Sequence, residues 1–181
     1  INTIPAFGAA PADGSGQTIA LVEAYNEPTI LSDLDGFDRE MSLKSSSTAT
    51  LYQAYGPASS FVTVYNQNGA NITPDIGMSG SSGVPAEDPN GFWELEETLD
   101  VEWAHAIAPG ARIAIIELNA EADNTFFDGF KLAASLPGVS AVSLSRGLYE
   151  WSGETAYDSS TFVTPAGHAG VTFLAVSNDY G

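Results

Sequence analysis

The feature that most constrains the fold of this chain is a series of short, nearly continuous apolar runs. Strands that are buried on both faces of a parallel sheet have this character. Longer stretches with helical spacing separate the runs, and strands that alternate with helices are typical of an α/β protein. We expect strands at residues 18–25, 61–66, 112–118, 139–145 and 171–177.

Helices are expected between these strands, at residues 28–41, 93–108, 124–136 and, over a shorter stretch, 160–169. Two of them run into a Pro-Gly pair, which is a normal helix stop. Neither an internal repeat nor an interdomain linker is visible. The sequence therefore predicts one α/β domain over residues 1–181 with a mostly parallel sheet.

The strong acidity of the chain excludes some classes of partner. The sequence has 5 Lys and Arg residues against 23 Asp and Glu, a formal charge of -18. Nucleic acid and anionic membranes are poor partners for such a surface. The acidity is consistent with a need for high solubility. It is equally consistent with a protein that works at low pH, where protonated carboxyls no longer repel one another. No apolar run reaches the roughly 18 residues that span a bilayer.

The stretch WELEETLDVEW places five acids on one expected helix without a basic residue among them. Glu96 and Asp100 are four residues apart, so both project from the same side. Two close carboxyls push their pKa values apart, and such a pair is suited to general acid/base catalysis. The alternative is that acids favour a helix N-terminus and face water. We expect Glu94, Glu97 and Glu102 to be such solvent-facing charges.

Ligands of open α/β sheets gather at the carboxyl ends of the strands. Asp179 follows the last expected strand. It could belong to a functional site at the end of that strand, or it could cap the turn before Gly181.

The two histidines, His105 and His168, invite a Ser-His interpretation with Ser143, Ser145 or Ser177. The sequence has no G-x-S-x-G elbow. Packing or a structural hydrogen bond is therefore the expected role of both histidines.

Four stretches of the chain together resemble the sedolisins, the serine-carboxyl peptidases of acidic environments. They are GQTIALVEAYNEPTILSDLDGFDREMSL, WELEETLDVEWAHAIAPGARIAIIE, GVSAVSLSRGLYE and FVTPAGHAGVTFLAVSNDYG. The resemblance implies a subtilisin-like, mostly parallel sheet with helices on both faces, incomplete in this chain. Residues 1–181 would form the N-terminal portion of a single catalytic domain.

The resemblance also implies roles for individual residues. Glu96 would be the general base that takes a proton from a nucleophilic serine, and Asp100 would orient it and tune its pKa. Asp179 would be a protonated donor to the oxyanion, although Asn178 and Tyr180 stand where the family has Gly and Ser.

The substrate strand of the family, Ser-Trp-Gly, is matched by Ser145, Arg146 and Gly147, which would pair with a peptide backbone. Arg146 replaces an aromatic wall with a cation. No serine here matches the nucleophile, which the family carries further downstream, followed by a calcium site. The resemblance thus implies no metal or other cofactor within this chain, and a partner chain or segment that supplies the serine.

We therefore expect one part of a secreted endopeptidase that cleaves peptides or proteins in an acidic environment. Because the chain starts at Ile1 rather than Met, we expect a processed, mature product. Two alternatives stay open. The chain could be an inactive fragment, a pseudopeptidase or a binding module on the same fold. A Ser-His hydrolase that uses His168 would have a neutral pH optimum.

Overall fold

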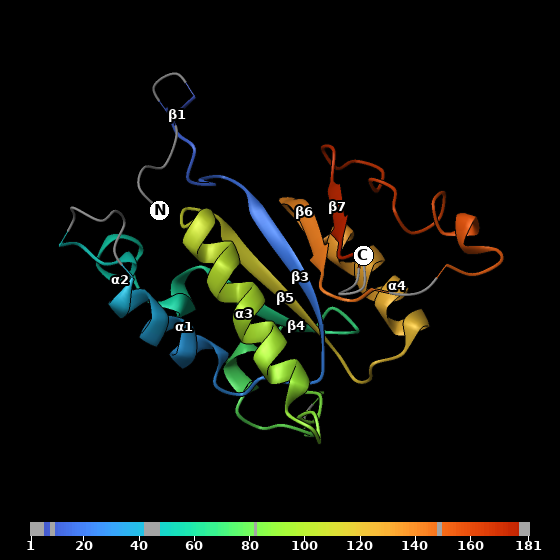
Figure 1. Cartoon of the computed structure of the whole chain (residues 1–181), viewed down its shortest axis with the longest axis horizontal. Helices are drawn as coiled ribbons and strands as arrows, with labels where there is room; N and C mark the ends of the chain where they lie inside the picture. Colours follow the sequence, from blue (N-terminus) through green and yellow to red (C-terminus); the bar gives the residue numbers. More distant parts are fainter. Residues whose placement is uncertain (1–5, 8–9, 42–47, 82, 148–149, 178–181) are drawn as a thin grey trace.

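A parallel sheet forms the centre of the computed structural model, which describes residues 6–7, 10–41, 48–81, 83–147 and 150–177 (Figure 1). Its five strands lie in the order β4-β5-β3-β6-β7, and every pairing between them is parallel. Two short strands near the N-terminus, β1 (Ala6–Phe7) and β2 (Ala10–Pro11), pair separately and antiparallel. The bounds of the sheet strands are β3 (Thr18–Ala24), β4 (Val62–Asn66), β5 (Arg112–Leu118), β6 (Val139–Leu144) and β7 (Thr172–Ala175).

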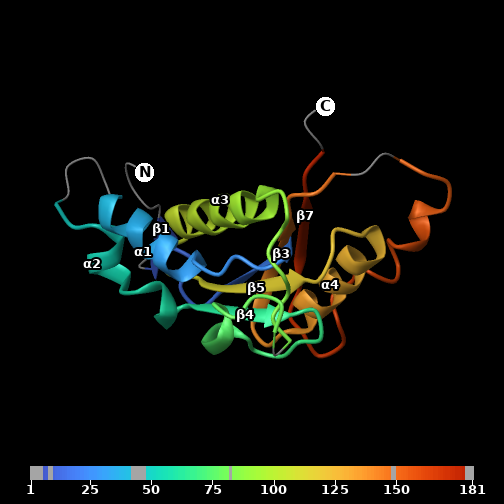
Figure 2. The same cartoon turned by 90° about the horizontal axis from the view of Figure 1, so that it is seen from below.

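Helices cover both faces of the sheet, as Figure 2 shows. Helix α3 (Phe92–Ile107) packs on β3 and β5, with α1 (Ile30–Glu40) beside it and α2 (Leu51–Tyr55) against α1. Helix α4 (Asp123–Ser135) lies on the opposite face, against β3, β5 and β6. In the part of the chain that the structure describes, no helix is long and apolar enough to cross a membrane.

Alternating side chains of the central strands contribute to two separate hydrophobic cores, one on each face of the sheet. Leu21 points to the face of α1 and α3, whereas Ala20 and Val22 point to the face of α4. Gly129 lets α4 come close to the sheet, since a Cβ atom at this position would lie 2.8 Å from Val22 Cγ1. The same alternation turns Glu23, two residues after Leu21, toward α3.

The structure confirms the α/β prediction of a mostly parallel sheet with helices on both faces. Each of the five expected strands is present, with ends that differ by at most a few residues. The helix expected at residues 160–169 is wrong, because this segment forms turns. Pro165 and Gly167, whose φ of 85° is left-handed, interrupt any helix here.

Candidate active site at the carboxyl edge of the sheet

Helix α3 begins at a well-defined cap, which fixes the position of the acids that follow. Asp88 Oδ2 accepts hydrogen bonds from the backbone N–H groups of Phe92 and Trp93, at 2.9 and 3.2 Å. Glu94 Oε1 in turn accepts from the Asp88 N–H at 2.8 Å. This reciprocal arrangement resembles a capping box and satisfies N–H groups that the first turn leaves open.

Asp100, one turn after Glu96 on α3, is tied to the sheet by Ser145. The Ser145 hydroxyl donates to Asp100 Oδ2 at 2.7 Å. Ser145 directly follows β6, so the bond joins the helix to the carboxyl edge of the sheet. Burial raises the pKa of Asp100, while hydrogen bonds from Ser145 and Glu23 oppose this rise.

Glu23 lies beneath Asp100 and was not identified by the sequence analysis. Its side chain, on β3, is completely buried. Burial raises the pKa of Glu23 well above its usual range, and the negative charges of Asp100 and Glu96 add to the effect. A protonated Glu23 would be a second donor to Asp100, in addition to the Ser145 hydroxyl. The available signal was the acid inside the otherwise apolar run TIALVEA.

Glu96 lies beside a hollow of about 320 Å³ that opens to solvent. The other residues that line it are Phe92, Trp93, Glu121 and Ser145. Aromatic and acidic groups therefore surround the space next to the Glu96 carboxyl, at the edge of the sheet where an α/β protein binds its ligands.

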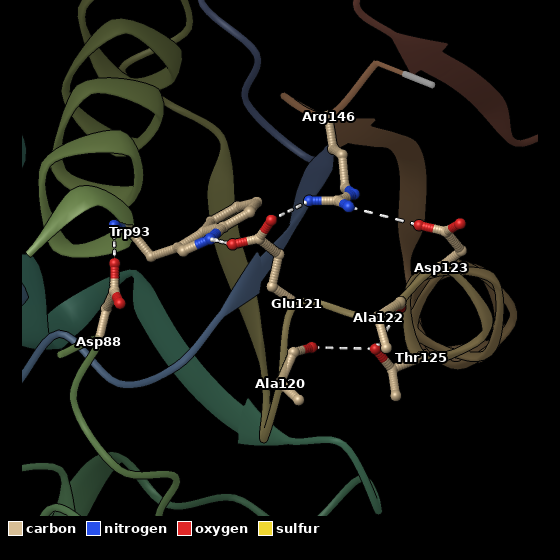
Figure 3. A network of polar contacts seen from close by, with 8 residues as sticks. All are labelled: Asp88, Trp93, Ala120, Glu121, Ala122, Asp123, Thr125 and Arg146. Carbon is tan, nitrogen blue, oxygen red and sulfur yellow. Dashed lines mark hydrogen bonds and ion pairs between the residues drawn. The ribbon is translucent and has the colours of Figure 1, made fainter. Parts of the chain in front are cut away.

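Arg146 links two acids on the far side of this region (Figure 3). Its guanidinium lies 2.7 Å from Glu121 Oε1 and 3.3 Å from Asp123 Oδ1, and it lies over the ring of Phe126. The indole N–H of Trp93 donates to Glu121 Oε2 at 3.0 Å. The bond from Trp93, followed by that from Arg146, lowers the pKa of Glu121.

The structure thus brings together three predicted site residues, Glu96, Asp100 and Ser145. Arg146 follows on the same segment, where it bonds to acids of the β5–α4 connection, and the half-buried Gly147 comes next. Asp179 lies outside the described residues, and its role stays a prediction.

The expectation that Glu97 faces solvent is wrong, because this side chain is only 1% exposed. Glu97 is one residue from Glu96, and a helix turns by about 100° per residue. The neighbour of an acid at the edge of the helix therefore points into the space between α3 and the sheet. Glu94 and Glu102 are partly exposed.

His105 has the structural role that was expected, and His168 lies away from the site. His105 is buried, with Nε2 3.2 Å from Asp38 Oδ2 and its ring stacked on Phe61. His168 lines a hollow with Gln17 and Gly138, which precede β3 and β6 and so lie at the amino end of the sheet. Ser145 lies at the opposite end. Among the described residues, no group of three or more His, Asp or Glu side chains could hold a metal ion.

Comparison with known proteins relates the chain to one curated protein. The chain is 29% identical to Kumamolisin from Bacillus sp. (strain MN-32) over 173 residues, which are 93% of this chain and 26% of Kumamolisin. It therefore spans about a quarter of the length of this relative. No protein-family model matches the chain.

A solved structure is also similar, that of Pseudomonas sedolisin, a serine-carboxyl proteinase complexed with two molecules of pseudo-iodotyrostatin. The TM-score is 0.44 with 16% sequence identity, over 75% of this chain and 31% of the other. The likeness is too slight to carry an argument by itself. The match to Kumamolisin confirms the resemblance to the sedolisins and with it a relationship to serine-carboxyl peptidases.

Proposed function

We propose that this chain is part of a serine-carboxyl endopeptidase that works in acid. Glu96 is the general base, Asp100 holds and tunes it, and Asp179 is the oxyanion donor. The nucleophilic serine comes from another segment or chain of the same precursor. The observation that carries the proposal is the position of Glu96 and Asp100 on one turn of α3, beside an open hollow and bonded to the predicted substrate strand through Ser145.

The chemistry of this arrangement supports the assigned roles. A carboxylate is a weak base, so it can activate a serine hydroxyl only when it is held in contact and its conjugate acid is stabilised. Asp100 accepts a hydrogen bond from Ser145, which favours its ionised form and holds that carboxylate one turn from Glu96. That charge favours a proton on Glu96 after transfer.

An apolar surface on α3 supports a partner that carries the serine. Residues spaced by three or four positions lie on one face of this helix, and each is 44% or more exposed. They are Phe92, Leu95, Leu99, Trp103 and Ile107. A contiguous apolar face of this kind marks a protein contact, and Glu96 and Asp100 follow directly after two of its members.

The substrate, location and metal content follow from the same proposal. The substrate is a peptide or protein segment, which adds as a strand beside residues 145–147. The protein is secreted into an acidic environment. Calcium, if the complete enzyme binds it, is held by the part that follows this chain.

The test uses the full precursor or this chain together with its serine-bearing part. Glu96→Gln is expected to abolish peptide cleavage at acidic pH while leaving the circular dichroism spectrum unchanged. Glu102→Gln, on the same helix but farther along, is the matched control and should retain activity. Cleavage that persists in Glu96→Gln would overturn the assignment of the base.

The same preparation decides between the enzyme and its alternatives. A complete wild-type protein that binds peptides without cleaving them would be a pseudopeptidase or binding module. Activity with a neutral optimum that is lost in His168→Ala would support a Ser-His hydrolase instead.

A further inference from the structure

A ring of side-chain contacts borders the hollow next to the proposed base. On one side of the ring, the Trp93 indole and the Arg146 guanidinium both donate to Glu121 (Figure 3). On the other side, the Ser145 hydroxyl donates to Asp100. Ser145 and Arg146 are neighbours in the chain, and α3 closes the ring because Trp93 and Asp100 lie about two turns apart on it. Three members of the ring, Trp93, Glu121 and Ser145, also line the hollow.

Ser145 and Arg146 lie just beyond the paired part of β6. This strand pairs with β3 as far as Ser143 and with β7 as far as Leu144. The two side chains that follow reach in different directions. The Ser145 hydroxyl bonds to α3, whereas the Arg146 guanidinium bonds to the β5–α4 connection and the start of α4. Side-chain contacts therefore hold this segment where the strand ladder ends.

The guanidinium of Arg146 is held by several groups at once. It lies 2.7 Å from Glu121 Oε1 and 3.3 Å from Asp123 Oδ1, and its central carbon lies 5.2 Å from the centre of the Phe126 ring. A single exposed ion pair contributes little to stability, whereas a cation between two acids and an aromatic face belongs to a network. The Arg146 side chain is only 21% exposed, so it is turned into the protein.

Glu121 is fixed from its other side, so Arg146 pairs with an acid that is already in place. The indole N–H of Trp93, a residue only 8% exposed, donates to Glu121 Oε2 at 3.0 Å. The connection that carries Glu121 is tied to α4, because the Thr125 hydroxyl donates to Ala120 O at 3.0 Å. A side chain that is already ordered loses less entropy when it forms an ion pair. Glu121 is thus a fixed anchor for Arg146.

We propose that Arg146 is a positioning residue, and that its ion pair with Glu121 keeps the Ser145 hydroxyl on Asp100. Arg146 acts on Asp100 through Ser145, its neighbour in the chain. Without the anchor, the segment after β6 moves away from α3 and Asp100 loses this donor. The positioning itself does not depend on the peptidase assignment, whereas its effect on cleavage rests on the proposed function.

The titration of the acids supports an anchor that persists in acid. The bond from Trp93, followed by that from Arg146, lowers the pKa of Glu121. Glu121 therefore stays ionised at a pH where an ordinary glutamate takes up a proton. Burial raises the pKa of Asp100, and the bond from Ser145 opposes this rise. The pKa of Asp100 consequently reports whether Ser145 is in position.

A ¹³C NMR titration of Asp100 in the 181-residue chain tests the proposal without any need for activity. Arg146→Ala is expected to raise the pKa of Asp100, as Ser145→Ala does. The double variant should show no larger rise than Ser145→Ala alone, because both substitutions remove the same hydrogen bond. Lys131→Ala removes an exposed cation from α4 and is the control, which should leave the Asp100 titration unchanged.

Glu121→Ala separates positioning from a simple effect of charge. Loss of a nearby negative charge would by itself lower the pKa of Asp100. Loss of the anchor should instead raise it, because Ser145 then leaves Asp100. A lowered or unchanged pKa of Asp100 in Glu121→Ala would refute the proposal, and so would additive effects of Arg146→Ala and Ser145→Ala. If Arg146→Ala does not fold, Glu121→Ala decides alone, since it leaves the guanidinium in the chain.

In the complete enzyme the positioning role and the peptidase assignment can fail separately. Arg146→Ala should move the acid limb of kcat/KM to higher pH, in the same direction as Ser145→Ala, because coupled carboxyls titrate as a unit. An unchanged acid limb together with a raised pKa of Asp100 would count against the role of Asp100 in cleavage alone. An unchanged Asp100 titration in Arg146→Ala would refute the positioning role, whatever the activity.

Discussion

The Ser145 hydroxyl donates a hydrogen bond of 2.7 Å to Asp100, and this bond joins the residue after β6 to the middle of α3. It connects a residue predicted to bind substrate with one predicted to tune the base. If residues 145–147 bind substrate as proposed, occupation of this strand would be coupled to the charge of Asp100 through one hydroxyl.

Ser145→Ala is expected to raise the pKa of Asp100 further, because the variant removes a donor that favours the ionised form. The free energy of unfolding should fall by about 1 kcal/mol. A ¹³C NMR titration of Asp100 and urea unfolding measure the two effects. Ser140→Ala is the control, since Ser140 on the same strand donates to Thr18 O and should leave the Asp100 titration unchanged.

Arg146→Ala is expected to raise the pKa of Glu121 toward its usual value, with Trp93 remaining as a donor. In wild type the lowered pKa favours folding above the usual carboxyl pKa, and this contribution is lost as the pH falls. The variant should therefore lose less stability on acidification. Side-chain NMR titration of Glu121 gives the measurement. Lys131→Ala, which removes an exposed cation from α4, should not change it.

Asp38→Ala is expected to destabilise the chain by about 3 kcal/mol, because it leaves the buried His105 without its acidic partner. Thermal or urea unfolding measures the loss. Asp128→Ala removes the acid of an exposed pair with Lys131 and should cost less than about 1 kcal/mol. Equal effects of the two substitutions would contradict a structural role for the Asp38–His105 pair, which joins α1 to α3.

Gly129→Ala is expected to destabilise the chain by about 1–3 kcal/mol, because the new methyl would lie 2.8 Å from Val22 Cγ1 and force α4 from the sheet. Gly36→Ala in α1 is the matched control. Beyond its chain neighbours and the backbone of its own helix, no atom lies within 4 Å of the added Cβ. The better helix propensity of alanine should therefore stabilise the chain by about 0.5–1 kcal/mol. Urea midpoints that shift in opposite directions for the two variants, with unchanged m-values, would establish both effects.

The sequence was sufficient to predict the sheet and the common side of α3 from which Glu96 and Asp100 project. The nearly continuous apolar runs at 112–118 and 139–145 indicate strands because burial in a parallel sheet favours apolar residues at most positions. The spacing of Glu96 and Asp100 fixes their common side because a helix repeats every 3.6 residues.

The buried acids could not be predicted in the same way. Glu97 looks like an ordinary charge in the sequence, and only the packing of α3 over β3 and β5 shows that it does not reach solvent. Glu23 becomes a site residue only through its contact with Asp100. Contacts between distant segments decide these cases, and one-dimensional spacing does not record them.

Strand β3 is the first strand of the sheet along the chain and lies at its centre, between β5 and β6. Thr18 pairs with Arg112 on one side and with Val139 on the other. A ribosome must therefore synthesise the chain as far as Arg112 before β3 meets either neighbour. Closing such long loops is slow, and unpaired apolar strands aggregate meanwhile. The late arrival of these neighbours leaves β3 unpaired for longer than a strand that pairs with the next one along the chain.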